Sequence, residues 1–243
     1  MDLRDRVALV TGGAKRIGRA IALRLARARC HVAIHFHTSA AEAEATAAEC
    51  RAAGVRAETF GADLGDPSAA AELVPRVLTR LGRLDVLVNN ASVFEPMGLD
   101  DFDLADWERA LRVNLTAAAV LVHAAREALR RARGRVVNLC DASTSHPWPD
   151  YLAYAVSKGG LVTLTQVLAR ALAPEVNVVG VAPGVAAWPP HYDESLRARI
   201  LARVPLGRAG TPEDIAAAVH FLVTEGDYIT GLVLPVDGGR RIV

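Results

Sequence analysis

A chain of 243 residues with a net charge of +1 and 51% hydrophobic residues fits one large α/β domain or two small ones. The balanced charge gives no broad electrostatic footprint for nucleic acid or for a membrane surface, so neither is expected as a partner. Three scattered cysteines favour a reducing cytoplasm over a disulfide framework. The beginning of the chain lacks the apolar core of a signal peptide, and no apolar run is long enough to span a bilayer. We therefore expect a soluble cytoplasmic protein.

Apolar strand patterns alternate with helical patterns along the chain. The expected strands are 7–10, 31–36, 56–60, 85–88, 135–139, 176–181 and 232–236. The expected helices are 17–29, 40–53, 68–81, 104–132, 152–172, 193–203 and 212–224. Near-continuous apolar strands separated by helices predict a parallel sheet covered on both faces. No linker or repeat divides the chain, so we predict a single α/β domain, 1–243, with a doubly wound sheet of about seven strands.

A glycine-rich turn lies between the first predicted strand and the first predicted helix. It contains Gly12 and Gly18, with Arg16 and Ile17 between them. Here the backbone can approach a pyrophosphate, and the helix N-terminus supplies N–H groups and a positive dipole. Such turns are common, but the position after the first strand of a doubly wound sheet favours a dinucleotide site.

The end of the second predicted strand lacks the acid that would bind the ribose 2′-hydroxyl of NAD. His37 and Ser39 follow this strand instead, and with Arg16 nearby such a pocket suits a 2′-phosphate. These residues favour NADP over NAD. A metal site is the alternative, because His31, His35 and His37 alternate onto one strand face. No cysteine or carboxylate completes that set, so we expect no metal.

Tyr154 and Lys158 lie four residues apart and would share one face of a helix. Lys158 is one of only two lysines among 28 basic residues. Its ammonium could lower the tyrosine's pKa from the reference of about 10, which suggests acid–base chemistry. A surface pair without function is the alternative. Asp141 lies thirteen residues before the tyrosine.

Taken in order, the motifs of this chain resemble those of the short-chain dehydrogenase/reductases. They are Thr11-Gly12, Asp63-Leu64, Asn89-Asn90-Ala91-Ser92, Asn114, Tyr154 with Lys158, Pro183-Gly184, and Val236-Asp237-Gly238-Gly239. The resemblance covers essentially the whole chain. It implies a Rossmann-like fold, hydride transfer with a nicotinamide cofactor, and a homotetramer.

The resemblance also implies a role for individual residues. Tyr154 would donate or accept the proton, and Lys158 would hold the nicotinamide ribose and lower the pKa of the tyrosine. Asn114 would anchor a water in a proton relay; its alternative is a packing asparagine bonded to a backbone carbonyl. Asp63 would contact the adenine; its alternative is a helix N-cap. The implied cofactor residues are Gly12, Arg16, Ile17, Gly18, His37, Ser39, Asp63, Leu64, Asn90, Ala91, Ser92, Lys158, Pro183 and Gly184.

Two departures from the general family pattern are informative. Arg16 replaces the middle glycine of the turn, and Asp141 replaces the usual serine. With Phe94, these changes resemble the pteridine reductase branch. That branch implies that Asp141 and Tyr154 share proton delivery, that Ser92 touches cofactor or substrate, and that Phe94 stacks on a pterin ring. Thr38 departs from this pattern, because a basic residue often holds the 2′-phosphate there.

The aspartate also bears on the reaction chemistry. An ionised carboxylate would repel the alkoxide that forms when a ketone is reduced. A pterin C=N bond instead needs a proton on nitrogen, which an aspartic acid can supply. We therefore expect an NADPH-dependent reductase of dihydropterins, with dihydrofolate as a further candidate. The alternative is a carbonyl reductase, such as a 3-oxoacyl-[acyl-carrier-protein] reductase or another alcohol dehydrogenase, in which Asp141 only caps its turn and Ser143 is the polar donor. A non-catalytic NADP-binding sensor is the third hypothesis, against which the tyrosine argues.

Residues Trp188, Pro189, Pro190, His191 and Tyr192 fall in the segment that covers the substrate in this family. An apolar, aromatic lid suits a flat heterocycle, so Trp188 is expected to contact the substrate. The alternative is a subunit contact, since family tetramers are commonly built on the helices expected at 104–132 and 152–172.

Overall fold

The computed structural model describes residues 1–188 and 192–243. Within these residues, seven parallel strands form one sheet in the order β3-β2-β1-β4-β5-β6-β7. The strands are β1 (Val7–Val10), β2 (His31–Phe36), β3 (Ala57–Gly61), β4 (Val86–Asn89), β5 (Arg135–Leu139), β6 (Asn177–Pro183) and β7 (Val233–Val236). The strand order reverses between β1 and β4. In a doubly wound sheet, this reversal opens a crevice at the carboxyl ends of the strands.

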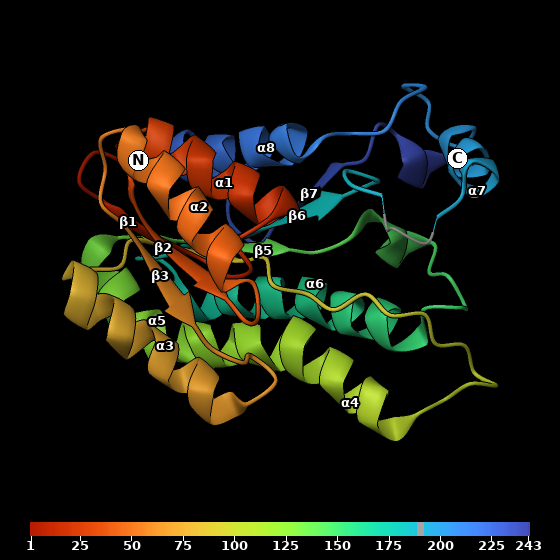
Figure 1. Ribbon diagram of the computed structural model, residues 1–243, viewed down its shortest axis with the longest axis horizontal. Helices are drawn as coiled ribbons and strands as arrows, with labels where there is room; N and C mark the ends of the chain where they lie inside the picture. Colours follow the sequence, from red (N-terminus) through yellow and green to blue (C-terminus); the bar gives the residue numbers. More distant parts are fainter. Residues whose placement is uncertain (189–191) are drawn as a thin grey trace.

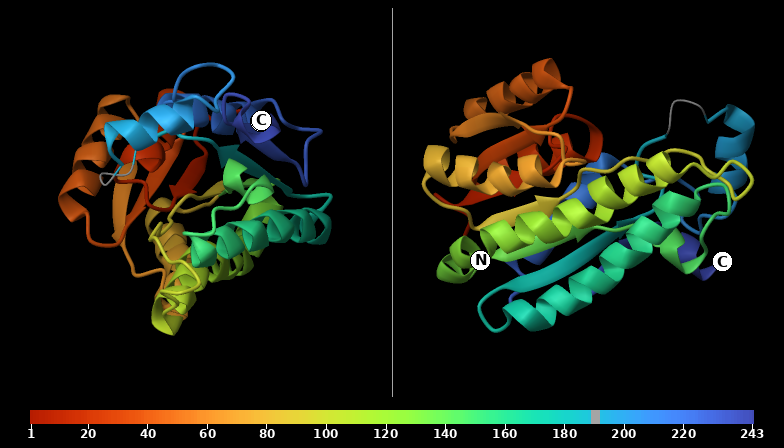
Figure 2. Two further views of the ribbon diagram at one scale, coloured as in Figure 1. Left: turned by 90° about the vertical axis from the view of Figure 1, so that its right-hand side faces the viewer. Right: turned by 90° about the horizontal axis from the view of Figure 1, so that it is seen from below.

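Helices cover both faces of the sheet (Figures 1 and 2). One face carries α1 (Arg16–Arg27), α2 (Ala40–Ala52) and α8 (Pro212–Thr224). The other carries α3 (Pro67–Leu81), α5 (Ala117–Ala132) and α6 (Leu152–Leu172), and α4 (Leu104–Leu111) extends the layer of α5. The short α7 (Glu194–Leu201) lies near the C-terminus (Figure 1). This three-layer arrangement confirms the predicted Rossmann-like fold. No helix in the described part of the chain is long and apolar enough to cross a membrane.

The two faces of the sheet bury separate apolar clusters. Ala8 and Val10 of β1 belong to the cluster that includes Ile21 of α1. Leu9 belongs to the opposite cluster, which includes Leu73 of α3. This division follows from the strand geometry, because successive side chains point to opposite faces. All four residues of β1 are fully buried, so this interior strand is a rigid support for the turn that follows it.

The predicted strands and helices begin and end within two residues of their observed bounds, with one difference inside the long helix expected at 104–132. There a π-helical turn, η1 (Arg112–Thr116), separates α4 from α5. Asn114 lies in this turn and is buried. Its side-chain amide contacts the segment after β4 and not its own helix, and π-helical turns often mark such positions.

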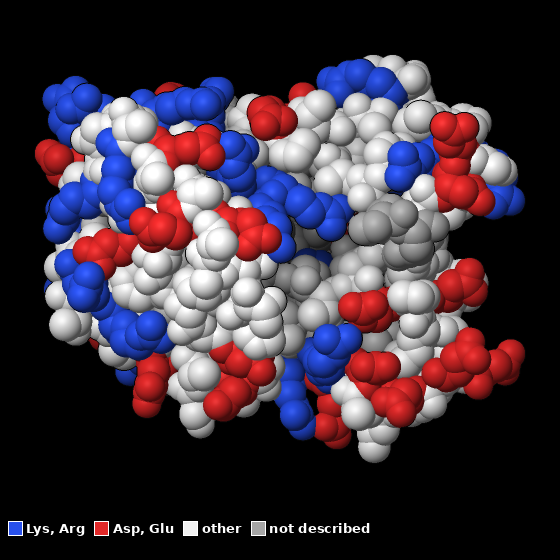
Figure 3. Space-filling view, viewed as in Figure 1, with Lys and Arg blue, Asp and Glu red and all other residues white. Residues whose placement is uncertain are grey.

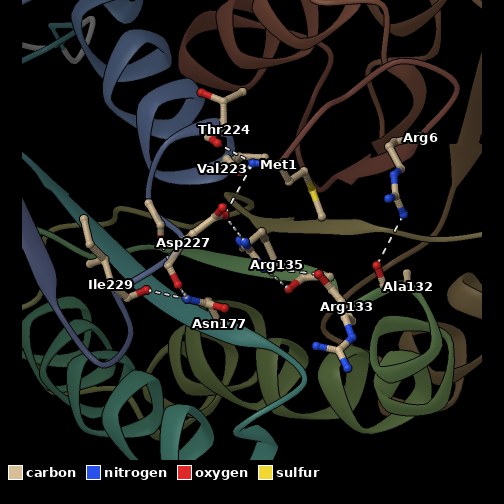
Figure 4. A network of polar contacts seen from close by, with 12 residues as sticks. Met1, Arg6, Ala132, Arg133, Arg135, Asn177, Val223, Thr224, Asp227 and Ile229 are labelled. Atoms are coloured by element: carbon tan, nitrogen blue, oxygen red, sulfur yellow. Dashed lines mark hydrogen bonds and ion pairs between the residues drawn. The ribbon is translucent and has the colours of Figure 1, made fainter.

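A polar network closes the amino-terminal edge of the sheet, away from the crevice (Figure 4). Arg135, the first residue of β5, pairs with Asp227 over 2.5 Å. The amino group of Met1 donates to the carbonyl of Thr224 at the end of α8 and lies 3.4 Å from the same aspartate. Asn177 of β6 donates to the backbone between α8 and β7. These contacts hold β5, β6 and α8 together beneath the site.

Candidate active site

The carboxyl ends of β1, β4, β5 and β6 open onto a cavity of about 640 Å³. Figure 3 shows a hollow in this face, with basic side chains along part of its rim. The cavity lies at the point where the strand order reverses, where ligands bind in such folds. The predicted site residues that line it are Gly12, Arg16, Ile17, Asn90, Ala91, Ser92, Phe94, Asp141, Tyr154, Lys158, Pro183 and Gly184.

The other predicted site residues are not among the described residues that line this cavity. They are Gly18, His37, Ser39, Asp63, Leu64, Asn114 and Trp188. Gly18 lies beneath the turn, where an added Cβ would come within 2.1 Å of the Gly12 carbonyl oxygen. His37 and Asp63 lie side by side after β2 and β3, with His37 Nε2 4.0 Å from Asp63 Oδ2. Asp63 is not an N-cap, because Asp66 caps α3.

The glycine turn is bonded to the end of β4. The Thr11 hydroxyl accepts the N–H groups of Asn90 and Ala91, and the Asn90 amide donates to the carbonyls of Thr11 and Gly12. Arg16 has a φ of +52°, a left-handed conformation that glycine adopts more easily. A glycine would adopt this conformation with less strain than arginine, which explains why the family pattern has a glycine at this position. The result is an open loop of backbone, with few side chains in the way of a pyrophosphate.

A hydrogen bond to His35 joins the same turn to β2, and the position of His35 in the sequence does not reveal this role. Its buried ring accepts the N–H of Gly12 at Nδ1 over 3.1 Å and contacts the carbonyl of Ala62 at Nε2 over 3.1 Å. The ring is therefore neutral, with its proton on Nε2, and burial lowers the pKa of His35 to about 4. His31 likewise accepts the N–H of Arg56. Backbone N–H groups thus occupy Nδ1 of both His31 and His35.

The two basic residues of the turn point in different directions. The Arg16 guanidinium donates to the carbonyl of Ala187, which follows β6. The Lys15 ammonium pairs with Glu42 of α2 over 3.0 Å, close to Ser39, the N-cap of α2. Since β6 and β2 lie on opposite sides of β1, the Arg16 side chain points away from the start of α2, and its role beside a 2′-phosphate stays a prediction. Lys15 is the basic residue of the turn that faces the start of α2.

Asp141 uses its two carboxylate oxygens differently. Oδ1 accepts the N–H of Ser143 over 2.7 Å and caps the short 3-10 helix η2 (Ala142–Ser145). Oδ2 accepts the hydroxyl of Tyr154 over 2.5 Å. The structure thus combines both interpretations of the sequence, a turn cap and a partner of the tyrosine.

The environment of Tyr154 does not lower its pKa. Burial raises the pKa of Tyr154 well above its usual value, and the charge and hydrogen bond of Asp141 raise it further. The Lys158 ammonium is 5.7 Å from the centre of the tyrosine ring and donates to the carbonyl of Leu139 over 2.7 Å. Burial lowers the pKa of Lys158 itself. The expectation that Lys158 lowers the tyrosine's pKa is therefore wrong for this arrangement, because the hydroxyl points to a carboxylate.

Asn114 connects the segment after β4 with the helix that carries Tyr154. Its Oδ1 accepts the N–H of Val93 over 2.8 Å, and its Nδ2 donates to the Val93 carbonyl and to the Ser157 hydroxyl. Ser157 in turn donates to the backbone carbonyl of Tyr154. The side chain therefore has the packing role that the sequence left as the alternative. A water anchored at Asn114 stays a prediction.

Aromatic rings form one wall of the cavity. Phe94 stacks on Tyr151, with ring centres 4.3 Å apart, and meets Tyr154 edge-on at 4.6 Å. Tyr151 therefore covers one face of the ring that the resemblance assigns to pterin stacking. Trp148 packs against Tyr151 at 5.8 Å, and Tyr192 lines the cavity near them. No spacing pattern in the sequence signals Trp148 or Tyr151, because neighbouring loops bring these rings to the site.

Trp188 is not among the described residues that line the cavity, although it lies beside Tyr192, which does. Its ring lies 5.6 Å from the guanidinium of Arg197 on α7 and 6.4 Å from the ring of Tyr192. Pro189, Pro190 and His191 of the expected lid lie outside the described residues. Any contact of Trp188 with a substrate therefore remains a prediction.

Comparison with known proteins agrees with this geometry. The family model described as enoyl-(acyl carrier protein) reductase matches residues 12–241. The chain is 35% identical to a 3-oxoacyl-[acyl-carrier-protein] reductase of Synechocystis, over 98% of this chain and 97% of that protein. It is 32% identical to glucose 1-dehydrogenase 2 of Bacillus subtilis, over 99% of this chain and 96% of that protein.

Three solved structures share the fold over nearly the whole chain, each with a TM-score of 0.93 and 34% identity. One is a blue fluorescent protein from a metagenomic library in complex with NADPH, with 99% of each chain covered. Another is FolM alternative dihydrofolate reductase 1 from Brucella canis, complexed with NADP, with 100% of this chain and 96% of that chain covered. The third is a short-chain dehydrogenase/reductase mutant of Serratia marcescens, with 99% and 100% covered.

Proposed function

Because the chain belongs to the short-chain dehydrogenase/reductase family and is an NADP(H)-dependent oxidoreductase, we propose that it reduces a C=N bond of a dihydropterin, with dihydrofolate as a related substrate. The observation that carries this proposal is the 2.5 Å hydrogen bond from the Tyr154 hydroxyl to Asp141 in the cavity. The likeness to FolM alternative dihydrofolate reductase 1 supports it.

The residues around the glycine turn fit a dinucleotide. A Cβ on Gly12 would lie 3.1 Å from Ala91 Cα, so glycine lets the turn pack closely against the end of β4. Gly12, Ile17 and Asn90 would line the cofactor, and His37, Ser39, Asp63 and Leu64 would surround its adenosine end. Lys158 uses one of its three N–H donors on Leu139, so the others are available for the nicotinamide ribose. When bound, NADPH supplies the hydride.

Tyr154 and Asp141 would deliver the proton. As the carbon of the C=N bond receives the hydride, its nitrogen needs one proton. The raised pKa of Tyr154 keeps its hydroxyl protonated at neutral pH, so the proton is present when it is needed. Asp141 lines the cavity and would carry a replacement proton from solvent to the tyrosine. Ser92 and Phe94, which also line the cavity, would contact the cofactor or the substrate.

A carbonyl reductase is the second candidate. The likeness to a 3-oxoacyl-[acyl-carrier-protein] reductase and to glucose 1-dehydrogenase 2 favours it. Ser143 also lines the cavity and could donate a hydrogen bond to a carbonyl oxygen. In that reaction Asp141 would act only as the cap of its turn.

NADPH oxidation with dihydrobiopterin, dihydrofolate and an acetoacetyl thioester, followed in parallel, separates these functions. Turnover of a pterin supports the proposal. Turnover of the thioester alone would overturn it in favour of the carbonyl reductase. If no compound is reduced, a non-catalytic NADP-binding sensor or a substrate outside this set becomes the better explanation.

We further propose that the chain is a single domain, forms a homotetramer and is cytoplasmic. All described strands belong to one sheet, which supports the single domain.

Apolar side chains on α4 and α6 are exposed, which supports a subunit contact there. They are Leu104 (60% exposed), Val156 (45%) and Val167 (56%). The three cysteines of the chain are free and buried, in keeping with a reducing compartment. Light scattering would test the tetramer, and a monomeric mass would contradict it.

A further inference from the structure

We propose that Arg240 forms a binding position for a carboxylate of the substrate, carried on a substituent remote from the bond that is reduced. The inference rests on the reductase function proposed above and narrows its substrate class. Arg240 lines the cavity, although it is only three residues from the end of the chain. Neither the sequence motifs nor the proposed chemistry uses this residue.

The turn before Arg240 is built to bring its side chain to the cavity. Gly238 and Gly239 have φ values of +65° and +87°, which favour glycine. The Asp237 carboxylate accepts the N–H of Gly239 over 3.0 Å and the N–H of Arg241 over 2.9 Å. These bonds fold the tail into the short 3-10 helix η3 (Arg240–Ile242), which packs beside η2, the helix that Asp141 caps.

Among the described residues, the Arg240 side chain makes no hydrogen bond or ion pair. Its guanidinium lies 4.8 Å from the centre of the Trp148 ring. The side chain is half-buried, and burial lowers the pKa of Arg240 while the charge of Asp141 opposes this shift. A guanidinium remains charged in a protein. A carboxylate placed beside this partly desolvated cation would stabilise its charge. Its planar N–H groups can bind both carboxylate oxygens.

The neighbours of Arg240 place it on the substrate side of the cavity. Successive ring contacts lead from Trp148 to Tyr151 at 5.8 Å, from Tyr151 to Phe94 at 4.3 Å, and from Phe94 to Tyr154 at 4.6 Å. Ring contacts thus connect the guanidinium to the proposed proton donor along the wall of the same cavity.

The other basic residues that line the cavity are engaged elsewhere. Lys15 pairs with Glu42, Arg16 donates to the Ala187 carbonyl, and Lys158 donates to the Leu139 carbonyl. Lys15 and Arg16 also lie on the turn that would hold the cofactor phosphates. A flat ring reacting beside Tyr154 along the aromatic wall would therefore direct a charged substituent toward Arg240.

Steady-state kinetics of Arg240→Gln tests this position. Dihydrofolate carries carboxylates on its substituent, whereas the side chain of dihydrobiopterin is uncharged. With NADPH as cofactor, we expect the variant to raise the KM for dihydrofolate on the order of 10-fold, which is the effect of losing a charge-assisted pair. The KM for dihydrobiopterin should stay within about 2-fold of the wild-type value. Arg240→Lys should lie between, because it keeps the charge but not the paired donors. Arg241→Gln is the matched control, since it removes an adjacent charge that does not line the cavity.

An equal loss with both substrates would overturn the proposal, because Arg240 would then act on a step common to both. No loss with either substrate would also overturn it. If the wild-type enzyme reduces neither pterin, the pterin function fails separately. The same variants are then compared with a long-chain oxo acid, whose carboxylate is remote from its ketone, and with its uncharged ethyl ester. A selective loss with the oxo acid keeps the carboxylate position, whereas an unchanged preference or no turnover of either compound overturns it.

Discussion

The hydroxyl of Tyr154 donates to Oδ2 of Asp141 over 2.5 Å, while Oδ1 of the same carboxylate caps the N–H of Ser143. One side chain thus holds both a proposed acid and a turn. The two roles use different oxygens, so mutation can separate them.

Substitution of Asp141 by Ser should remove the contact with Tyr154 but keep the cap, because a serine oxygen can accept an N–H two residues ahead. We expect kcat/KM for dihydrobiopterin to fall by on the order of 10²-fold, the usual weight of a positioned acid. Asp66→Ser is a suitable control, since Asp66 caps α3 through Ser68 in the same manner, away from the cavity. Unchanged pterin reduction in Asp141→Ser would make Asp141 only a turn residue.

His35 should make the stability of the protein depend on pH. Its folded-state pKa of about 4 lies below the ordinary value of 6.5, so between these values the unfolded chain binds a proton that the folded chain does not. The contribution of neutral His35 to the free energy of unfolding is fully present above pH 6.5. It is lost as the pH falls toward 4, by up to about 3 kcal/mol. Urea unfolding at pH 7 and pH 5 measures this loss.

The variant His35→Asn should flatten that pH dependence, because its Oδ1 can accept the Gly12 N–H without titrating. His123→Asn, a substitution at an exposed position on α5, is the control and should retain the wild-type slope. The same slope in wild type and His35→Asn would show that His35 does not cause the loss.

Lys15 should contribute more than Arg16 to the choice of NADPH over NADH. The Lys15 ammonium faces the start of α2, where a 2′-phosphate would follow β2, whereas Arg16 points toward Ala187. We expect Lys15→Ala to raise the KM for NADPH on the order of 10-fold and to leave that for NADH nearly unchanged. The ratio of kcat/KM for the two cofactors is the measurement. A larger fall of that ratio in Arg16→Ala would restore Arg16 as the 2′-phosphate residue.

Asn114→Ala should destabilise the site by leaving the Val93 N–H without its partner. An unsatisfied buried donor costs about 1–3 kcal/mol, and the Ser157 hydroxyl loses a donor as well. We expect the free energy of unfolding to fall by about this amount, with reduced activity because α6 positions Tyr154. Thr165→Val is a matched control on the same helix. It also removes a buried hydrogen bond, the one that Thr165 accepts from Asn138, but this bond lies away from Tyr154. Full stability in Asn114→Ala would contradict the packing role.

Much of the fold could be predicted from local patterns. The alternation of Ala8 and Leu9 onto opposite faces of β1 follows from strand geometry, and apolar strands separated by helices require a sheet covered on both sides. Gly12 and Gly18 mark the turn, because any side chain there would meet backbone. The pairing of Tyr154 with Asp141 was also expected from their spacing and the family resemblance.

Other features depended on contacts between distant segments. The direction of Arg16 is set by a carbonyl 171 residues further along the chain, and the state of His35 by the turn after another strand. The raised pKa of Tyr154 results from burial around a carboxylate, which no residue spacing can measure.

Short-range periodicity and sterics are sufficient to predict the sheet, the cofactor turn and the chemical types of the proposed catalytic residues. Which charges are paired depends instead on contacts between distant segments. The packing of the tail against the loop after β5 places Arg240 against Trp148, with no anionic partner among the residues that the structure describes.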